Sequence, residues 1–186
     1  MRVFVAIPIP EGLQGEILAW EEKCRGLPVR WLKRKNLHVT LVPPWEEEAA
    51  RVPEVLSRMG EAVHILKDSL TLSFSRVRFG PDPQRPRLIW AEGETPRALA
   101  VLARELHGRL GMAPEQRSFR LHLTLARFRP EDFASFPRRD LDEWVSWRME
   151  AKAVMLMQSR LLRGGAEYEV LGETPFSSRF SSRGGR

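Results

Sequence analysis

Leu37-His38-Val39-Thr40-Leu41 is a five-residue phrase that returns later in the chain, with one substitution, as Leu121-His122-Leu123-Thr124-Leu125. The chain has only four histidines, and two of them stand in this setting. Side chains at positions i and i+2 of a strand share a face. Each phrase therefore predicts a strand that buries aliphatic side chains on one face and presents an imidazole beside a hydroxyl on the other.

The rest of the chain predicts strands alternating with helices. Apolar runs and period-two patterns predict strands at residues 2–7, 29–32, 37–42, 70–79, 88–91, 119–128, 149–157 and 168–171. Helical spacing of apolar residues predicts helices at residues 11–24, 46–63 and 95–110. We expect residues 29–32 and 37–42 to form a strand pair or one bent strand, which Pro43-Pro44 ends. Thr95 is the expected N-cap of the third helix, and Gly164-Gly165 an expected turn.

This order of elements predicts an α+β fold with mostly antiparallel strands. The repeated phrase adds a two-fold echo, so we expect a bilobal molecule. Its two mostly antiparallel sheets, with flanking helices, would be related by a pseudo-two-fold, and the active groove would lie between the lobes. Residues 1–176 are expected to form this single domain, and residues 177–186, rich in Ser, Arg and Gly, a mobile basic tail.

Composition limits the compartment and the class of partner. The net charge is +6, and 25 of the 30 basic residues are arginine, which favours an anionic partner. Cys24, the single cysteine, excludes an internal disulfide and a cysteine-rich metal cage, so we expect a reducing cytoplasm. The N-terminal apolar run is too short for a signal core or a membrane span.

Two imidazoles and two hydroxyls in one groove suit phosphodiester chemistry. In-line displacement at phosphorus needs a base on the attacking oxygen and an acid on the leaving oxygen, on opposite sides. His38 and His122 can divide these roles, and the hydroxyls of Thr40 and Thr124 can donate to the non-bridging oxygens. A cyclic phosphate is a suitable substrate because its ring is strained. No further His, Cys or carboxylate ligands flank the two strands, so neither a metal nor a cofactor is expected.

These residues resemble the two-histidine (2H) phosphoesterase superfamily, and within it the RNA 2',3'-cyclic phosphodiesterases, also called 2'-5' RNA ligases. The resemblance extends over nearly the whole chain. It includes the N-terminal strand (residues 2–7), the approach to the first phrase and the phrase itself (30–41), the second phrase with its trailing Arg127, and a C-terminal hairpin (159–168).

The resemblance implies metal-independent hydrolysis of an RNA 2',3'-cyclic phosphate end to a 2'-phosphate. In some members it implies the joining of RNA halves, such as tRNA halves, through a 2'-5' bond. It makes His38 the proton donor to the departing 3' oxygen and His122 the base that activates water. Thr40 and Thr124 would hold the phosphate, and Arg127 would add charge to it.

Two positions depart from the simple pattern. Pro43 stands where the family usually has an aromatic residue that can stack on a base. Strict alternation puts Arg127 on the face opposite His122, so it needs a twist or a strand end to reach the groove.

Four further sets of residues complete the expected picture. Trp31 and Trp45 are the candidate stacking residues, and Arg34 is a candidate contact for the RNA backbone. The other tryptophans are expected in the core or between the lobes; they are Trp20, Trp90, Trp144 and Trp147. His64 and His107, which lack a Thr partner, are expected to be structural.

Two other functions stay open on the sequence alone. The same groove could take a small cyclic nucleotide or a cyclic ADP-ribose derivative instead of RNA. A non-catalytic module that holds phosphate-ended RNA is the alternative of another class. The basic charge and the arginine-rich end favour RNA as the partner, and a monomer is expected because no feature demands a dimer.

Overall fold

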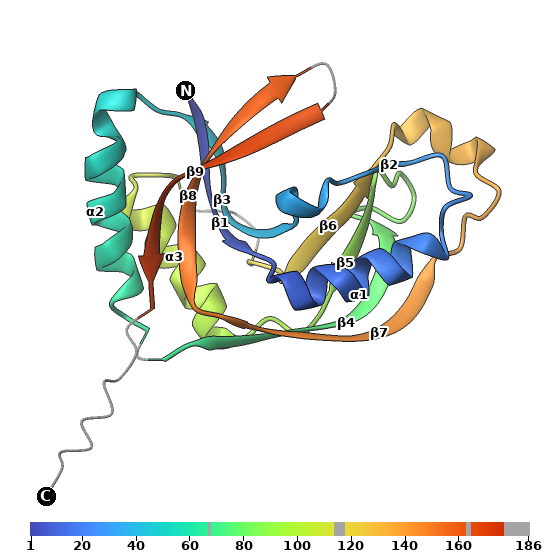
Figure 1. The fold of residues 1–186 in the computed structure, drawn as a ribbon, viewed down its shortest axis with the longest axis horizontal. Coiled ribbons are helices and arrows are strands. Elements are labelled where there is room, and N and C mark those ends of the chain that lie inside the picture. The colour runs from blue at the N-terminus through green and yellow to red at the C-terminus, as the bar shows by residue number, and fades with distance from the viewer. Residues whose placement is uncertain (67, 114–117, 163–164, 177–186) are drawn as a thin grey trace, which may run out of the picture.

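The computed structural model describes residues 1–66, 68–113, 118–162 and 165–176 (Figure 1). The expected tail at 177–186 and Gly164 of the expected turn lie outside these residues. The strands are β1 (Arg2–Pro8), β2 (Arg30–Trp31), β3 (His38–Glu46), β4 (Leu70–Gly80), β5 (Leu88–Glu92), β6 (His122–Arg127), β7 (Asp142–Ala151), β8 (Ala153–Leu162) and β9 (Gly165–Pro175). The helices are α1 (Glu11–Glu22), α2 (Val52–Val63) and α3 (Arg97–Arg109), with 3₁₀ turns at Arg34–Asn36, Ala49–Arg51 and Pro130–Ser135. Among the described residues, no helix is long and apolar enough to cross a membrane.

The strands form two sheets, one in each lobe. The four-stranded sheet has the order β3-β1-β8-β9, and the five-stranded sheet has the order β2-β6-β5-β4-β7. The pairings within both sheets are antiparallel. The expected α+β fold with two antiparallel sheets is therefore confirmed.

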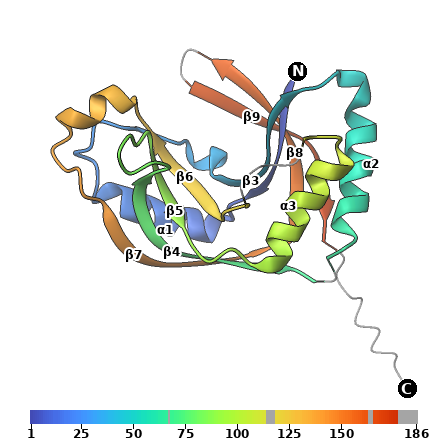
Figure 2. The same cartoon turned by 180° about the vertical axis from the view of Figure 1, so that it is seen from behind.

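The lobes exchange helices. α1 follows β1 of the four-stranded sheet but packs against β7 of the five-stranded one. α3 follows β5 of the five-stranded sheet but packs against α2 and β3 in the other lobe (Figures 1 and 2). Buried residues of both sheets consequently belong to one hydrophobic core. This shared core holds β3 and β6, which carry the two His-Thr phrases, in a fixed relation.

The approach to the first phrase differs from the expectation. Residues 29–32 and 37–42 form neither a strand pair nor a bent strand, because β2 and β3 belong to different sheets. Pro43-Pro44 also does not end the strand, which continues to Glu46. β3 is an edge strand, and an edge strand can carry proline because its outward N–H groups have no partner in the sheet.

Two other expectations are wrong in detail. The strand expected over residues 149–157 is the meeting of two strands, since Lys152 separates β7 from β8 and the chain passes there from one sheet to the other. Thr95 does not cap α3. Its hydroxyl accepts a hydrogen bond from the backbone N–H of Leu121 (2.8 Å), and Pro96 occupies the cap position. Thr95 thus anchors the residue that precedes His122.

The tryptophans divide differently from the expectation. Trp20, Trp90 and Trp147 are buried, as expected. Trp144 is 76% exposed, so its assignment to the core or the lobe interface is wrong. It alternates along β7 with half-buried Glu143 and Val145, and its side chain is therefore on the outer face of that strand.

Candidate active site

The two His-Thr phrases lie on strands that contact each other across the lobes. His38 is the first residue of β3 and His122 the first residue of β6. The two strands pack together, one from each sheet (Figure 1). Their aliphatic residues are buried, whereas both histidines and both threonines are partly exposed. The sequence pattern thus predicted correctly which face of each strand is buried.

Both histidines are anchored in the same way. Nδ1 of His38 lies 2.6 Å from the carbonyl oxygen of Asn36, and Nδ1 of His122 lies 3.0 Å from that of Arg120. A carbonyl can only accept, so Nδ1 carries the hydrogen in each ring. Nε2 of each imidazole is then the nitrogen that can take or give a proton.

Aromatic rings from neighbouring strands fix the two imidazoles. His38 packs against Phe4 and Tyr168, with ring centroids 5.0 and 5.2 Å away. His122 packs against Trp90, with centroids 5.0 Å apart. His38 thus has rings from β1 and β9 against it, and water reaches it less easily.

Burial lowers the pKa of His38 to about 4, because the charged imidazolium loses hydration. The hydrogen bond to the Asn36 carbonyl opposes this change, and the positive charges of Arg127 and His122 lower the pKa of His38 further. His38 is consequently neutral at pH 7 in the free protein.

A β-bulge brings Arg127 to the face of His122 and Thr124. Trp90 pairs with Thr124 and Ile89 with Ala126, so Leu125 is an extra residue in β6. Leu125 and Ala126 are both buried, and alternation then resumes with Arg127 exposed. Strict alternation, which put Arg127 on the opposite face, fails at this bulge.

The first phrase has the same bulge. Leu41 is the extra residue of β3, since Ala6 pairs with Thr40 and Val5 with Val42. The burial pattern of residues 38–43 matches that of residues 122–127. Pro43 is therefore the counterpart of Arg127. Of these two equivalent positions, only the one in the second phrase supplies a guanidinium group.

The remaining candidate residues make their described contacts with groups other than the paired histidines. Trp31 is partly buried and packs edge-on against Trp20 of the core, with centroids 6.2 Å apart. Trp45 lies seven residues beyond His38 on β3, or roughly 23 Å along the strand. Arg34 donates from Nε to Oε1 of Gln14 (2.8 Å). The structure brings none of the three against His38 or His122.

Several residues of the site escaped sequence reasoning. Asn36, the acceptor for His38, also donates from Nδ2 to the carbonyl oxygen of Ala166 (2.8 Å) and so ties β9 to the approach to β3. Arg120 holds the same place before His122. Its guanidinium lies 5.4 Å from the ring centroid of Trp90 and bonds to Glu92 (3.0 Å). Asn36 and Arg120 each stand two residues before a histidine, and this shared position is the feature of the sequence that could have identified them.

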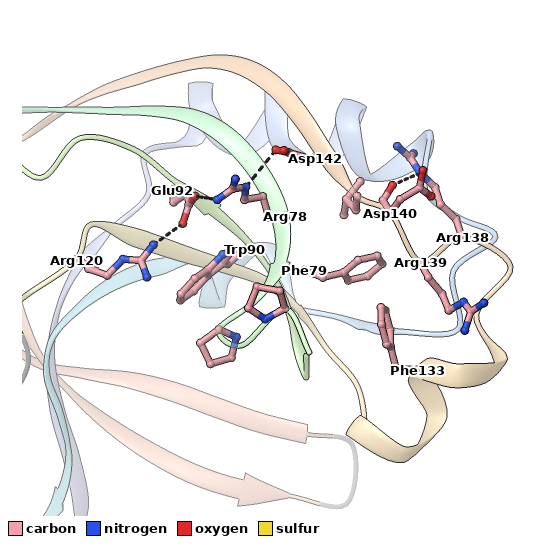
Figure 3. A pocket seen from close by; sticks show the side chains of 13 residues that line it. Arg78, Phe79, Trp90, Glu92, Arg120, Phe133, Arg138, Arg139, Asp140 and Asp142 are labelled. Atoms are coloured by element: carbon pink, nitrogen blue, oxygen red, sulfur yellow. Dashed lines mark hydrogen bonds and ion pairs between the residues drawn. The ribbon is translucent and has the colours of Figure 1, made fainter. Parts of the chain in front are cut away.

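Two cavities adjoin the site. One, of about 370 Å³, is lined by Arg127, Arg30 and Arg129, together with Pro28, Phe128 and Asp132. The other, of about 570 Å³, lies beside Trp90 and its walls include Arg78, Glu92 and Arg120 (Figure 3). Within the described residues, no group of three or more His, Cys, Asp or Glu side chains is placed to hold a metal ion.

Comparison with known proteins now identifies the family. Residues 9–161 match the model of the 2'-5' RNA ligase superfamily. The chain belongs to this superfamily. The relationship extends over most of the sequence and includes both His-Thr phrases.

Two archaeal members of the family are similar to the chain over nearly their whole length. An Archaeoglobus fulgidus protein named RNA 2',3'-cyclic phosphodiesterase is 29% identical over 181 residues, which cover 92% of this chain and 98% of the relative. A Methanocaldococcus jannaschii protein of the same name is 24% identical over 178 residues, which cover 93% and 99%.

Solved structures share the bilobal fold. A Thermus thermophilus protein matches with a TM-score of 0.78 at 21% identity, over 96% of this chain and 100% of the other. Escherichia coli LigT, crystallised with 3'-AMP, matches with a TM-score of 0.76 at 24% identity, over 95% and 98%. The 2H phosphoesterase fold expected from the two phrases is therefore confirmed.

Proposed function

We propose that this member of the 2'-5' RNA ligase superfamily hydrolyses the 2',3'-cyclic phosphate at an RNA end to a 2'-phosphate. The observation that carries the proposal is the matched pair of imidazoles, each anchored through Nδ1, on two strands that contact each other. The names of its archaeal relatives support the same reaction.

The chemistry needs one base and one acid at the same phosphorus atom. Nε2 of His122 takes a proton from water, whose oxygen forms the new bond to phosphorus. The bond from phosphorus to the 3' oxygen breaks, and Nε2 of His38 gives that oxygen its proton. The hydroxyls of Thr40 and Thr124 donate to the non-bridging oxygens, and Arg127 balances their charge.

His38 must take up a proton from solvent when the substrate binds. His38 is neutral in the free protein because burial lowers its pKa. A phosphodiester anion beside the ring favours the imidazolium and raises the pKa again. Binding of the cyclic phosphate is therefore coupled to uptake of the proton that the departing 3' oxygen needs.

The deciding experiment gives the protein a short RNA with a 2',3'-cyclic phosphate end, in EDTA, and identifies the product. We expect a 2'-phosphate and no need for a divalent cation. His38→Ala and His122→Ala should abolish turnover and keep the fold. His64→Ala is the matched control, because His64 makes the same kind of Nδ1 contact, to the Gly60 carbonyl (2.7 Å), on an exposed helix end.

Four outcomes would overturn this proposal. A 3'-phosphate product would reverse the assignment of the leaving oxygen, and full activity of either histidine variant would remove its role. Hydrolysis of a small cyclic nucleotide or of a cyclic ADP-ribose derivative, with none of RNA, would favour the first alternative. Tight RNA binding with no product and with affinity unchanged in the histidine variants would favour a non-catalytic module.

Reverse joining through a 2'-5' bond is tested by adding RNA with a 5'-hydroxyl end. A monomeric state and a cytoplasmic location stay predictions.

A further inference from the structure

Trp144 is an exposed aromatic side chain on the five-stranded sheet. It is 76% exposed, and it is the one aromatic among the large hydrophobic side chains exposed in the described part of the chain. The guanidinium of Arg76 lies 4.1 Å from its ring centroid. A ring held by a cation on one side and open to solvent on the other can stack on a further flat group.

Strand pairing places Trp144 on the same sheet face as His122. His122 pairs with Glu92, Glu92 with Arg76, and Arg76 with Trp144. Directly paired residues of antiparallel strands point to the same face. Three strand spacings of about 4.8 Å put Trp144 roughly 14 Å from His122 across the sheet.

A continuous series of side-chain contacts connects His122 with Trp144. Trp90, packed on His122, lies under Arg120, which bonds to Glu92 (3.0 Å). Arg78 joins Glu92 (2.8 Å) to Asp142 (3.1 Å), as Figure 3 shows. Asp142 in turn pairs with Arg76, beneath Trp144. We call Arg76, Arg78 and Arg120 the arginine ladder.

Two of the three arginines on this face are much more accessible than Glu92, which lies between them. The side chain of Glu92 is 16% exposed, whereas those of Arg78 and Arg120 are 43% and 65% exposed. Arg76 is 24% and Asp142 46% exposed. The ladder also has three cations against the two carboxylates of Glu92 and Asp142. The face therefore offers guanidinium groups to an anionic chain and ends at an aromatic platform.

We propose that this face binds the nucleotides on the 5' side of the cyclic phosphate, with one base stacked on Trp144. This inference rests on the proposed function. Single-stranded RNA fits because the arginine ladder starts at His122, where its phosphate end would react, and because phosphates and bases match arginines and an aromatic ring. A mononucleotide is too short to reach Trp144.

The test compares kcat/KM for two substrates, a nucleoside 2',3'-cyclic phosphate and a single-stranded hexanucleotide with the same end. We expect the wild type to prefer the hexanucleotide. Trp144→Ala should lower this preference about tenfold, since stacking of one base is worth that order of affinity, and Trp144→Phe should retain most of it. Arg76→Gln should also lower it. Arg58→Gln is the charge-matched control, because Arg58 pairs with Glu54 on α2, away from the sheet face.

The ratio of kcat/KM for the hexanucleotide to kcat/KM for the nucleoside cyclic phosphate separates this inference from the proposed function. Hydrolysis of both substrates with no preference, or with a preference that Trp144→Ala leaves intact, overturns the inference and leaves the function standing. If neither substrate is hydrolysed, the proposed function fails, and binding of the labelled hexanucleotide then decides. Weaker binding by Trp144→Ala than by Trp144→Phe upholds the inference, and equal binding overturns it.

Discussion

His38 and His122 have the same backbone anchor but different surroundings. Each gives its Nδ1 hydrogen to the carbonyl two residues earlier. His38, however, packs against two rings, and burial lowers its pKa to about 4. The two histidines therefore have different surroundings before the substrate binds. The sequence predicted which face of each strand carries the histidine. It could not predict this difference in surroundings, since Phe4 and Tyr168 are distant from His38 along the chain.

The pH dependence of the reaction should report this difference. Above about pH 4 His38 loses its proton in the free protein, so kcat/KM should fall as the pH rises, because substrate binding must then be accompanied by uptake of that proton. The corresponding fall in kcat should lie at higher pH, because the bound phosphate anion raises the pKa of His38. Initial rates over a pH series, at low and at saturating substrate, measure both changes.

A variant can test the cause of the lowered pKa. Tyr168→Leu removes one ring from His38 and admits water to it, so the pKa of His38 should rise and the fall of kcat/KM with rising pH should move to higher pH. If this fall keeps its place in Tyr168→Leu, burial by this ring does not set the pKa of His38.

At the scale of elements, the two phrases are alike in backbone structure as well as in sequence. Each strand has its bulge at the leucine after the threonine, Leu41 in one and Leu125 in the other. The period-two pattern predicted the strands and their buried faces, because aliphatic residues alternate with polar ones. It could not predict the bulges, since an extra residue leaves no mark in composition. Strict alternation therefore put Arg127 on the opposite face, and the bulge supplies the twist that Arg127 needs to reach the face of His122.

Gly80 supports the site through Trp90. A Cβ atom at Gly80 would lie 2.6 Å from the Trp90 ring, so Gly80→Ala must displace the indole that packs on His122. We expect a loss of about 1–3 kcal/mol in the free energy of unfolding, together with a lower kcat. Urea unfolding and initial rates measure the two effects.

Gly60 provides the matched control for this variant. It lies within α2, and a Cβ there meets nothing within 4 Å. Gly60→Ala should stabilise the protein by up to about 1 kcal/mol through helix propensity and leave kcat unchanged. A Gly80→Ala protein as stable and active as Gly60→Ala would show that Trp90 does not position His122.

At the scale of the whole molecule, the chain order predicted an α+β fold but not the assignment of elements to lobes. Hydrophobic periodicity tells which face of an element is buried, not which partner covers it. The exchange of α1 and α3 between lobes, and the change of sheet at Lys152, depend on contacts between distant segments. Trp144 was assigned to the core or the lobe interface because tryptophan is usually buried, and only the structure shows it exposed on the sheet face that also carries His122.

The central claim is that His38 and His122, brought together by the two lobes, act on one phosphate. Histidine labelled with ¹⁵N, observed by NMR during titration with a nucleoside 2'-monophosphate, tests it most directly. We predict that the Nε2 signals of His38 and His122 shift together and saturate at one equivalent of nucleotide, while those of His64 and His107 stay in place. A shift of only one of the two, or separate saturation of each, would contradict the claim.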